Sequence, residues 1–171
     1  DDTLQLAEVD GQWRIDQVPP ALYLSDNDVA RSYRAHALFF LDATGMRLVP
    51  EFVVVPSGAG NVSTVVMRAL LAGPSKEDPL STAIPARTRL IYGSVLGDFG
   101  TATVALNSRA LRATGVTRER MLAQIVWTVS GLLGIASVRV QAAGGTLAAA
   151  SGATSLSTYD FAAYDPTRRT D

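Results

Sequence analysis

Apolar residues recur along the chain with the spacings of short strands and of two longer helices. Residues 3–9 and 12–16 flank Asp10-Gly11, and an Asp-Gly pair between two alternating runs predicts a hairpin with a type I′ turn. A hairpin of two strands is not stable alone in water. We therefore expect this hairpin to join the main sheet or to be the end of a separate domain.

A break in the pattern follows this hairpin. The run Val18-Pro19-Pro20 indicates an extended linker, because each Pro restricts the backbone of the residue before it. Ser25, with acidic residues after it, predicts a short helix that reaches about Arg34. Residues 18–36 are thus expected to form a linker that contains one short helix.

Two pairs of strands are predicted in the main body. Residues 37–41 have the composition of a buried strand, and residues 46–55 form its expected partner. Pro50 cannot donate a ladder hydrogen bond, so it marks an edge or a bulge. The second predicted pair comprises residues 88–96 and 101–106 around a Gly-containing turn.

Apolar residues three and four positions apart predict two main helices. Asn61 can cap the first helix, which ends before a Gly-Pro pair. The second helix is expected to run from Thr117 to Gly134, with Leu132 and Leu133 on its wide apolar face.

The order of predicted elements indicates the fold class. A strand over residues 135–142 and a final short strand complete the order ββαββαββ from residue 37 onward. This order favours a two-layer α+β domain, with an antiparallel-rich mixed sheet and the two main helices on one face. The small, polar and aromatic composition of residues 151–171 indicates a linker.

Charge is distributed unevenly along the 171 residues. The first 28 residues carry seven acidic side chains against Arg14, whereas the remainder has a net charge of +5, and the formal total is -1. Such a balance lacks the strongly basic surface of a nucleic-acid-binding protein. No run of about 18 apolar residues predicts a transmembrane helix.

No residue cluster points to catalysis or to a metal. His36 is the only His and there is no Cys, so a zinc site would need three carboxylates around His36. Gly58-Ala59-Gly60 lacks the Lys of a phosphate-binding loop and indicates a flexible turn. Paired carboxylates could act as acid and base, but Glu77 and Asp78 fall in a loop and the turn explains Asp98 without function; the candidates are Glu51, Glu77, Asp78, Asp98 and Glu119. We expect no catalytic residue, metal or cofactor.

Two groups of residues are candidates for binding. Four arginines around Glu119 could hold a phosphate, an acidic peptide or a lipid head group, or could form a solvated helix start; they are Arg109, Arg112, Arg118 and Arg120. Aromatic residues in the polar tail could fold back on this domain or dock onto a neighbouring domain or partner; they are Tyr159, Phe161 and Tyr164.

Several strings together resemble a known family. The resemblance covers nearly the whole chain and rests on Gly11-Gln-Trp-Arg-Ile15, Leu38-Phe-Phe-Leu-Asp42, Ala69-Leu-Leu-Ala-Gly-Pro-Ser75, Thr82-Ala-Ile-Pro85 and Ala123-Gln-Ile-Val-Trp-Thr128. These strings are similar to LpqB-type lipoproteins of actinobacteria. The Leu-Leu-x-Gly-Pro and Ile-Pro strings look like the GerMN domain, which is named from spore-germination proteins.

This resemblance implies a domain organisation. The family has a lipidated N-terminal Cys, an NTF2-like domain, a GerMN domain and a C-terminal β-propeller. Residues 1–17 then correspond to the last hairpin of an NTF2-like domain, residues 37–150 to the GerMN domain, and residues 151–171 to a linker towards the propeller. On this basis we expect the chain to be a fragment of a longer protein.

The resemblance also implies a function. It predicts a non-catalytic, extracytoplasmic interaction module, held at the membrane surface through a lipid anchor, that assists a two-component sensor kinase of the MtrAB type. Its expected partners are the kinase's extracellular domain and adjacent domains of the same lipoprotein. The alternative function is binding of an anionic cell-wall ligand or polymer.

Overall fold

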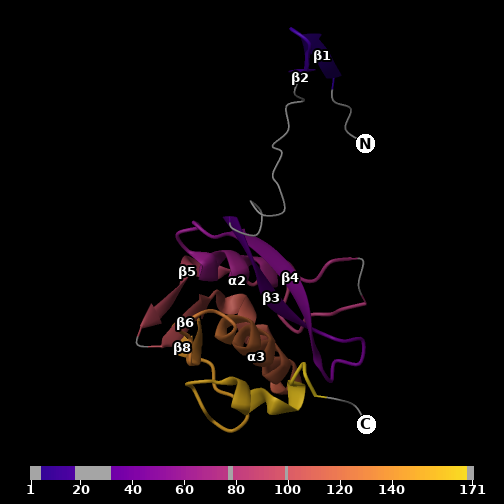
Figure 1. Cartoon of the computed structure of the whole chain (residues 1–171). Helices are drawn as coiled ribbons and strands as arrows, with labels where there is room; N and C mark the ends of the chain where they lie inside the picture. The colour runs from indigo at the N-terminus through magenta and orange to yellow at the C-terminus, as the bar shows by residue number, and fades with distance from the viewer. Residues whose placement is uncertain (1–4, 18–31, 77–78, 99, 169–171) are drawn as a thin grey trace. The chain divides into compact units, whose positions relative to one another are not determined.

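The computed structural model describes residues 5–17, 32–76, 79–98 and 100–168, which belong to two units, Asp1–Ser32 and Tyr33–Asp171 (Figure 1). The first unit contains strands β1 (Gln5–Val9) and β2 (Gln12–Gln17), which pair antiparallel as predicted. The turn between them has φ of 53° at Asp10 and 74° at Gly11. A type I′ turn requires positive φ at both central positions, which explains the Asp-Gly pair.

The second unit begins earlier than expected. Strand β3 spans Tyr33–Leu41, so Tyr33, Arg34 and His36 are in a strand and the predicted linker and helix end is wrong there. The rest of the predicted short helix, up to Arg31, lies outside the described residues.

Strands β3 and β4 (Leu48–Pro56) form a two-stranded antiparallel sheet. The register runs without a shift from Tyr33 opposite Pro56 to Leu41 opposite Leu48. Both strands are therefore edges of this sheet. Of the two positions predicted for Pro50, an edge or a bulge, the structure shows an edge.

A second sheet contains four strands, in the order β5-β6-β7-β8. The strands are β5 (Leu90–Asp98), β6 (Thr101–Leu106), β7 (Ser137–Ala142) and β8 (Gly145–Thr146). The β6–β7 pair is parallel and the other two pairs are antiparallel, so this sheet is mixed. Alternate residues of β6 and β7 are buried and form one wall of the core.

Helix α2 (Val62–Ala72) begins as predicted. The Asn61 Oδ1 atom accepts a hydrogen bond from the Thr64 backbone N–H at 3.1 Å, so Asn61 is the N-cap. The short 3₁₀ helix η1 (Ser108–Arg112) follows β6.

Helix α3 (Gly115–Ser130) ends earlier than predicted, with Gly131 as its C-cap. Leu132 and Leu133 therefore lie in a loop beyond the helix rather than on its apolar face. Leu133 is 98% exposed.

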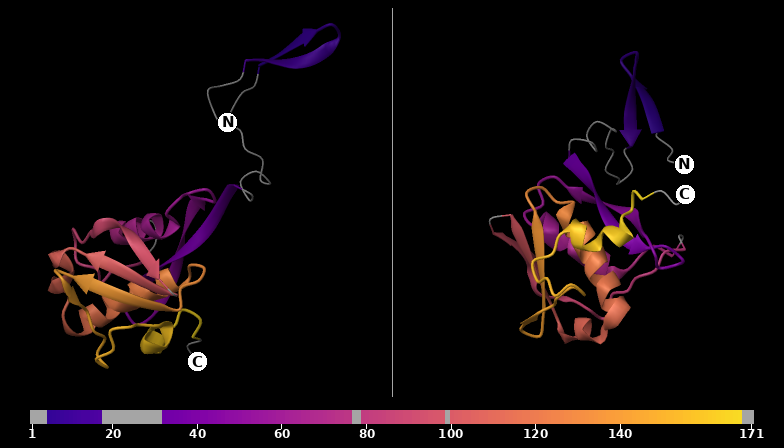
Figure 2. Two further views of the ribbon diagram at one scale, coloured as in Figure 1. Left: turned by 90° about the vertical axis from the view of Figure 1, so that its left-hand side faces the viewer. Right: turned by 90° about the horizontal axis from the view of Figure 1, so that it is seen from below.

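The core lies between the two sheets. Helix α2 contacts β3, β4 and β5, and α3 contacts β3 and β7, so each helix packs against strands of both sheets (Figure 2). The α+β class and the order ββαββαββ are confirmed. The strands nevertheless form two sheets, where the sequence pattern favoured one. None of the described helices is both long and apolar enough to cross a membrane.

The tail packs against the second unit instead of forming the linker expected for residues 151–171. Leu156 exchanges backbone hydrogen bonds with Val138 of β7 at 2.7 and 2.8 Å. The 3₁₀ helix η2 (Thr158–Tyr164) contacts α3, and Phe161 is only 1% exposed. The tail of the second unit is therefore part of the domain.

Candidate functional site

An open groove with aromatic walls lies where the tail meets α3 and β3. Phe39, Trp127 and Tyr159 line it, and its volume is about 360 Å³. The rings of Phe39 and Trp127 meet edge to face, with centroids 5.9 Å apart. The Trp127 indole N–H donates to the Phe161 carbonyl oxygen at 3.4 Å, which fixes the indole while Tyr159 remains 91% exposed. We call these three residues the aromatic groove.

The apolar surface continues along the outer face of the β3–β4 sheet. Residues directly opposite in an antiparallel pair share a face. Phe39 is opposite Pro50, and the next pair on the same face is Ala37 opposite Phe52, which is 65% exposed. The groove and this sheet face together present large apolar side chains to solvent.

The three tail aromatics named from the sequence have different environments. Phe161 is in the core, and Tyr164 is partly buried against it. Tyr159 alone contributes to the groove. Phe161 and Tyr164 thus fold back on the domain, which was the first of the two predicted alternatives. Tyr159 is exposed and is available to a partner.

The four candidate arginines lie around the start of α3 but not in one arrangement. The Arg118 Nε atom donates to the Ala113 carbonyl oxygen at 3.2 Å, which directs it back towards η1. Arg120 instead packs on Gly45, where an added Cβ would lie 3.0 Å from the Arg120 Nη1 atom. Arg109 and Arg112 belong to η1. The two α3 arginines therefore face different parts of the domain.

The candidate carboxylates that the structure describes have structural partners. Glu51 accepts from the Ser75 backbone N–H at 3.1 Å, and Glu119 from the Ala150 backbone N–H at 3.0 Å. Residues 77–78 and the side chain of Asp98 lie outside the described part. Among described residues, no group of three or more His, Asp or Glu could hold a metal ion.

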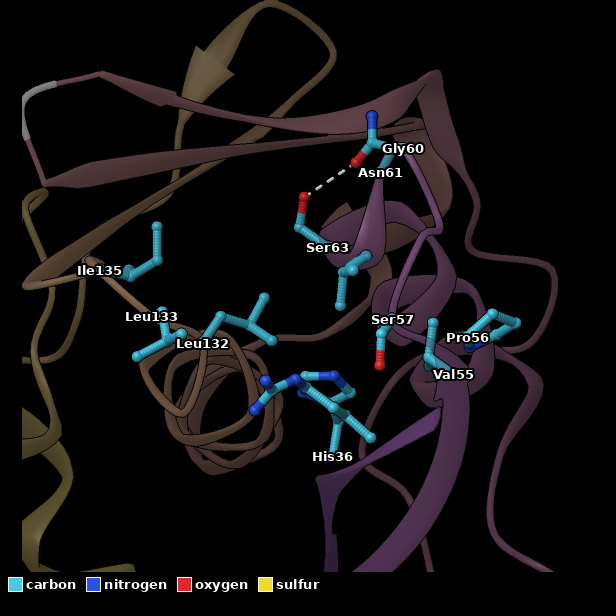
Figure 3. A pocket seen from close by; sticks show the side chains of 12 residues that line it. His36, Val55, Pro56, Ser57, Gly60, Asn61, Ser63, Leu132, Leu133 and Ile135 are labelled. Carbon is cyan, nitrogen blue, oxygen red and sulfur yellow. Dashed lines mark hydrogen bonds between the residues drawn. The ribbon is translucent and has the colours of Figure 1, made fainter. Parts of the chain in front are cut away.

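A second cavity was missed by the sequence analysis. His36, expected to be an ordinary linker or strand-edge residue, lines it together with Arg34, the start of α2 and the loop after α3 (Figure 3). One signal was present in the sequence: Arg34 and His36 are two positions apart, so in a strand they project from the same face. The helix predicted up to Arg34 concealed it.

Residues 37–148 match the model of the Germane family, which is described as sporulation and spore germination. The chain belongs to the Germane (GerMN) family. Gln124, Trp127 and Thr128 belong to one of the sequence strings similar to LpqB-type lipoproteins. In the GerMN domain, Gln124 and Thr128 form hydrogen bonds with Phe39 of β3, and Trp127 forms one with Phe161 of the tail.

The chain is also similar to curated proteins named Lipoprotein LpqB. The protein from Cutibacterium acnes is 31% identical over 144 residues, which cover 83% of this chain and 24% of that protein. The protein from Thermobifida fusca is 35% identical over 139 residues, covering 77% and 22%. The chain thus spans about a quarter of the length of these relatives.

Solved structures confirm the fold. The tandem GerMN domains of the sporulation protein GerM from Bacillus subtilis align with a TM-score of 0.60 at 18% identity, covering 81% of this chain and 49% of that chain. The first GerMN domain of the same protein aligns with a TM-score of 0.52 at 21% identity, covering 72% and 94%. At these identities the likeness concerns architecture alone.

Proposed function

We propose that this GerMN domain is a non-catalytic, extracytoplasmic interaction module of a lipoprotein that assists a two-component sensor kinase of the MtrAB type. The aromatic groove is its contact surface for the kinase's extracellular domain. The observation that carries the proposal is the groove itself, in which Tyr159 is 91% exposed beside a fixed Trp127.

Aromatic side chains of this kind supply much of the binding energy at protein interfaces. Trp and Tyr are enriched among the interface residues whose truncation to Ala costs about 2 kcal/mol or more of binding free energy. Trp127 is already held by its contacts with Phe39 and Phe161, so little conformational entropy is lost when a partner covers it. The exposed face around Phe52 extends the surface beyond the groove.

The family relationship supports the cellular setting. The similar proteins from Cutibacterium acnes and Thermobifida fusca are named lipoproteins, and a lipid anchor places a protein at a membrane surface. We infer that this chain belongs to the same extracytoplasmic context. The four arginines favour an anionic wall ligand less strongly, because the contacts of Arg118 and Arg120 direct them to different parts of the domain.

Calorimetric titration of the chain into the purified extracellular domain of the cognate kinase tests this proposal, at low and high salt. We expect saturable binding that Tyr159→Ala weakens at least tenfold, since its side chain is a central apolar contact. Apolar contacts are screened little by salt, so this loss should persist at both salt concentrations.

Tyr92→Ala is the matched control, because Tyr92 is 78% exposed on β5 and lies outside the groove. The thermal midpoints of both variants should stay at the wild-type value, since both side chains are exposed. Absence of binding by the folded chain, or equal effects of the two variants, would overturn the proposal.

A further inference from the structure

We propose that the cavity lined by Arg34 and His36 binds a small amphiphilic anion. Its carboxylate or phosphate head lies towards Arg34, and its alkyl tail lies towards Leu132 and Leu133. The site is separate from the aromatic groove, and the inference does not rest on the proposed kinase contact.

The cavity has the size and construction of a small-molecule site. Its volume is about 390 Å³, within the usual range for ligand pockets. Its walls come from β3, the end of β4 with the loop that follows, the start of α2, and the loop after α3. Segments far apart in sequence thus converge on one concave surface.

One side of the cavity is apolar. Leu132, Leu133 and Ile135 lie together on the loop that follows α3, opposite Ser57 and Asn61 (Figure 3). Helix α3 ends at Ser130, so these side chains lie on the following loop, where Leu132 and Ile135 also pack partly against the core. Leu133 is 98% exposed, and a ligand tail that covered it would remove apolar surface from water.

The remaining walls favour binding of a negatively charged group. Arg34 and His36 line the cavity from β3, and none of its lining residues is Asp or Glu. No carboxylate of the cavity lining neutralises Arg34, so its charge can act on a ligand there. Helix α2 begins at Val62 in the same wall, and the N-terminus of a helix carries partial positive charge. A cationic residue, a helix start and apolar walls together select an anion with an apolar tail.

The test is titration of the full chain with octanoate, octyl phosphate and octylammonium, followed by calorimetry and by NMR shifts of residues around the cavity. Both anions should bind and octylammonium should not. Tighter binding of octyl phosphate would indicate a lipid-phosphate head group as the source, and tighter binding of octanoate would indicate a free carboxylate.

A chain-length series separates the tail from the head. From hexanoate to octanoate, each added CH₂ that enters the cavity should lower Kd about fourfold, the factor that corresponds to burial of one CH₂. Leu133→Ser should flatten this gradient, whereas Leu111→Ser, which changes an exposed Leu on η1 outside the cavity, should leave it intact.

Arg34→Gln should weaken octanoate binding at least fivefold and remove its salt dependence, because it deletes the charge that attracts the head group. Arg112→Gln on η1 is the charge-matched control and should have no effect. Circular dichroism of each variant checks that it folds. Equal binding of octylammonium and octanoate, or unchanged affinity in both cavity variants, would overturn the proposal.

Discussion

Asp42 organises the turn between β3 and β4. Its Oδ1 atom accepts from the Thr44 hydroxyl at 2.8 Å and from the Met46 backbone N–H at 3.0 Å. Burial is the largest single influence on its pKa and acts to raise it. The hydrogen bonds from Thr44 and from the backbone of the turn outweigh burial together, so the pKa of Asp42 lies below its ordinary value.

We expect Asp42→Asn to lower the free energy of unfolding by about 1 kcal/mol at pH 7, since a carboxylate accepts hydrogen bonds more strongly than an amide. A pKa lower in the folded than in the unfolded state means that ionised Asp42 stabilises the fold above about pH 4. This stabilisation is lost as the pH falls through the folded-state pKa. Urea denaturation of both proteins between pH 7 and pH 3 should therefore show the difference shrinking on acidification.

The control for this series is Glu8→Gln, which removes one carboxylate from the separate β1–β2 hairpin. It should not reproduce the pH-dependent difference in the unfolding of the second unit. A difference between Asp42→Asn and the wild type that stayed constant down to pH 3 would contradict the assigned role.

Side chains of helix α3 form hydrogen bonds with backbone groups of β3 that do not pair with β4. The Gln124 Nε2 atom donates to the Phe39 carbonyl oxygen at 3.0 Å, and its Oε1 atom accepts from the Ala83 backbone N–H at 2.8 Å. The Thr128 hydroxyl accepts from the Phe39 backbone N–H at 3.0 Å. Because a buried backbone group without a partner is costly, these bonds explain polar residues on the most buried stretch of the helix.

We expect Gln124→Leu to lower the free energy of unfolding by about 2–4 kcal/mol, because it leaves two backbone groups without partners. Thr128→Val keeps the shape of the side chain and should cost about 1–3 kcal/mol for one such group. Thr103→Val on β6 is the matched control, since Thr103 is only half-buried and its hydroxyl has no hydrogen bond among the described residues. Urea denaturation monitored by circular dichroism gives all three values, and a neutral Gln124→Leu would show that the amide bonds are not needed.

Local signals allowed most elements to be predicted, but not their partners. Asp10-Gly11 and Asn61 act on their immediate neighbours, so the turn and the helix cap could be read from the sequence. The end of α3 at Ser130 could not, because apolar residues continue to Leu133 after the helix has stopped. Alternation in a strand shows which face is buried, not which strand lies beside it. The separation into two sheets therefore depends on contacts between distant segments.

The same limitation concealed the His36 cavity and, apart from Tyr159, the aromatic groove. Composition suggested that residues 151–171 were a linker, since isolated apolar residues in a polar segment have no period. Leu156 and Phe161 are nevertheless buried, because β7 and α3 offer them a complementary surface. The tail then brings Tyr159 to Trp127 and forms the aromatic groove. At the scale of the whole domain, the groove exists only while the tail is anchored.

This dependence gives a prediction that joins stability to function. Phe161→Ala removes a side chain that is only 1% exposed. It should lower the free energy of unfolding by about 3–5 kcal/mol. It should also raise hydrogen exchange along η2 and weaken binding of the kinase domain, since Tyr159 is no longer held beside Trp127. Tyr159→Ala should weaken binding with no loss of stability. If Phe161→Ala destabilised the chain but kept full affinity, the groove would not be the contact surface.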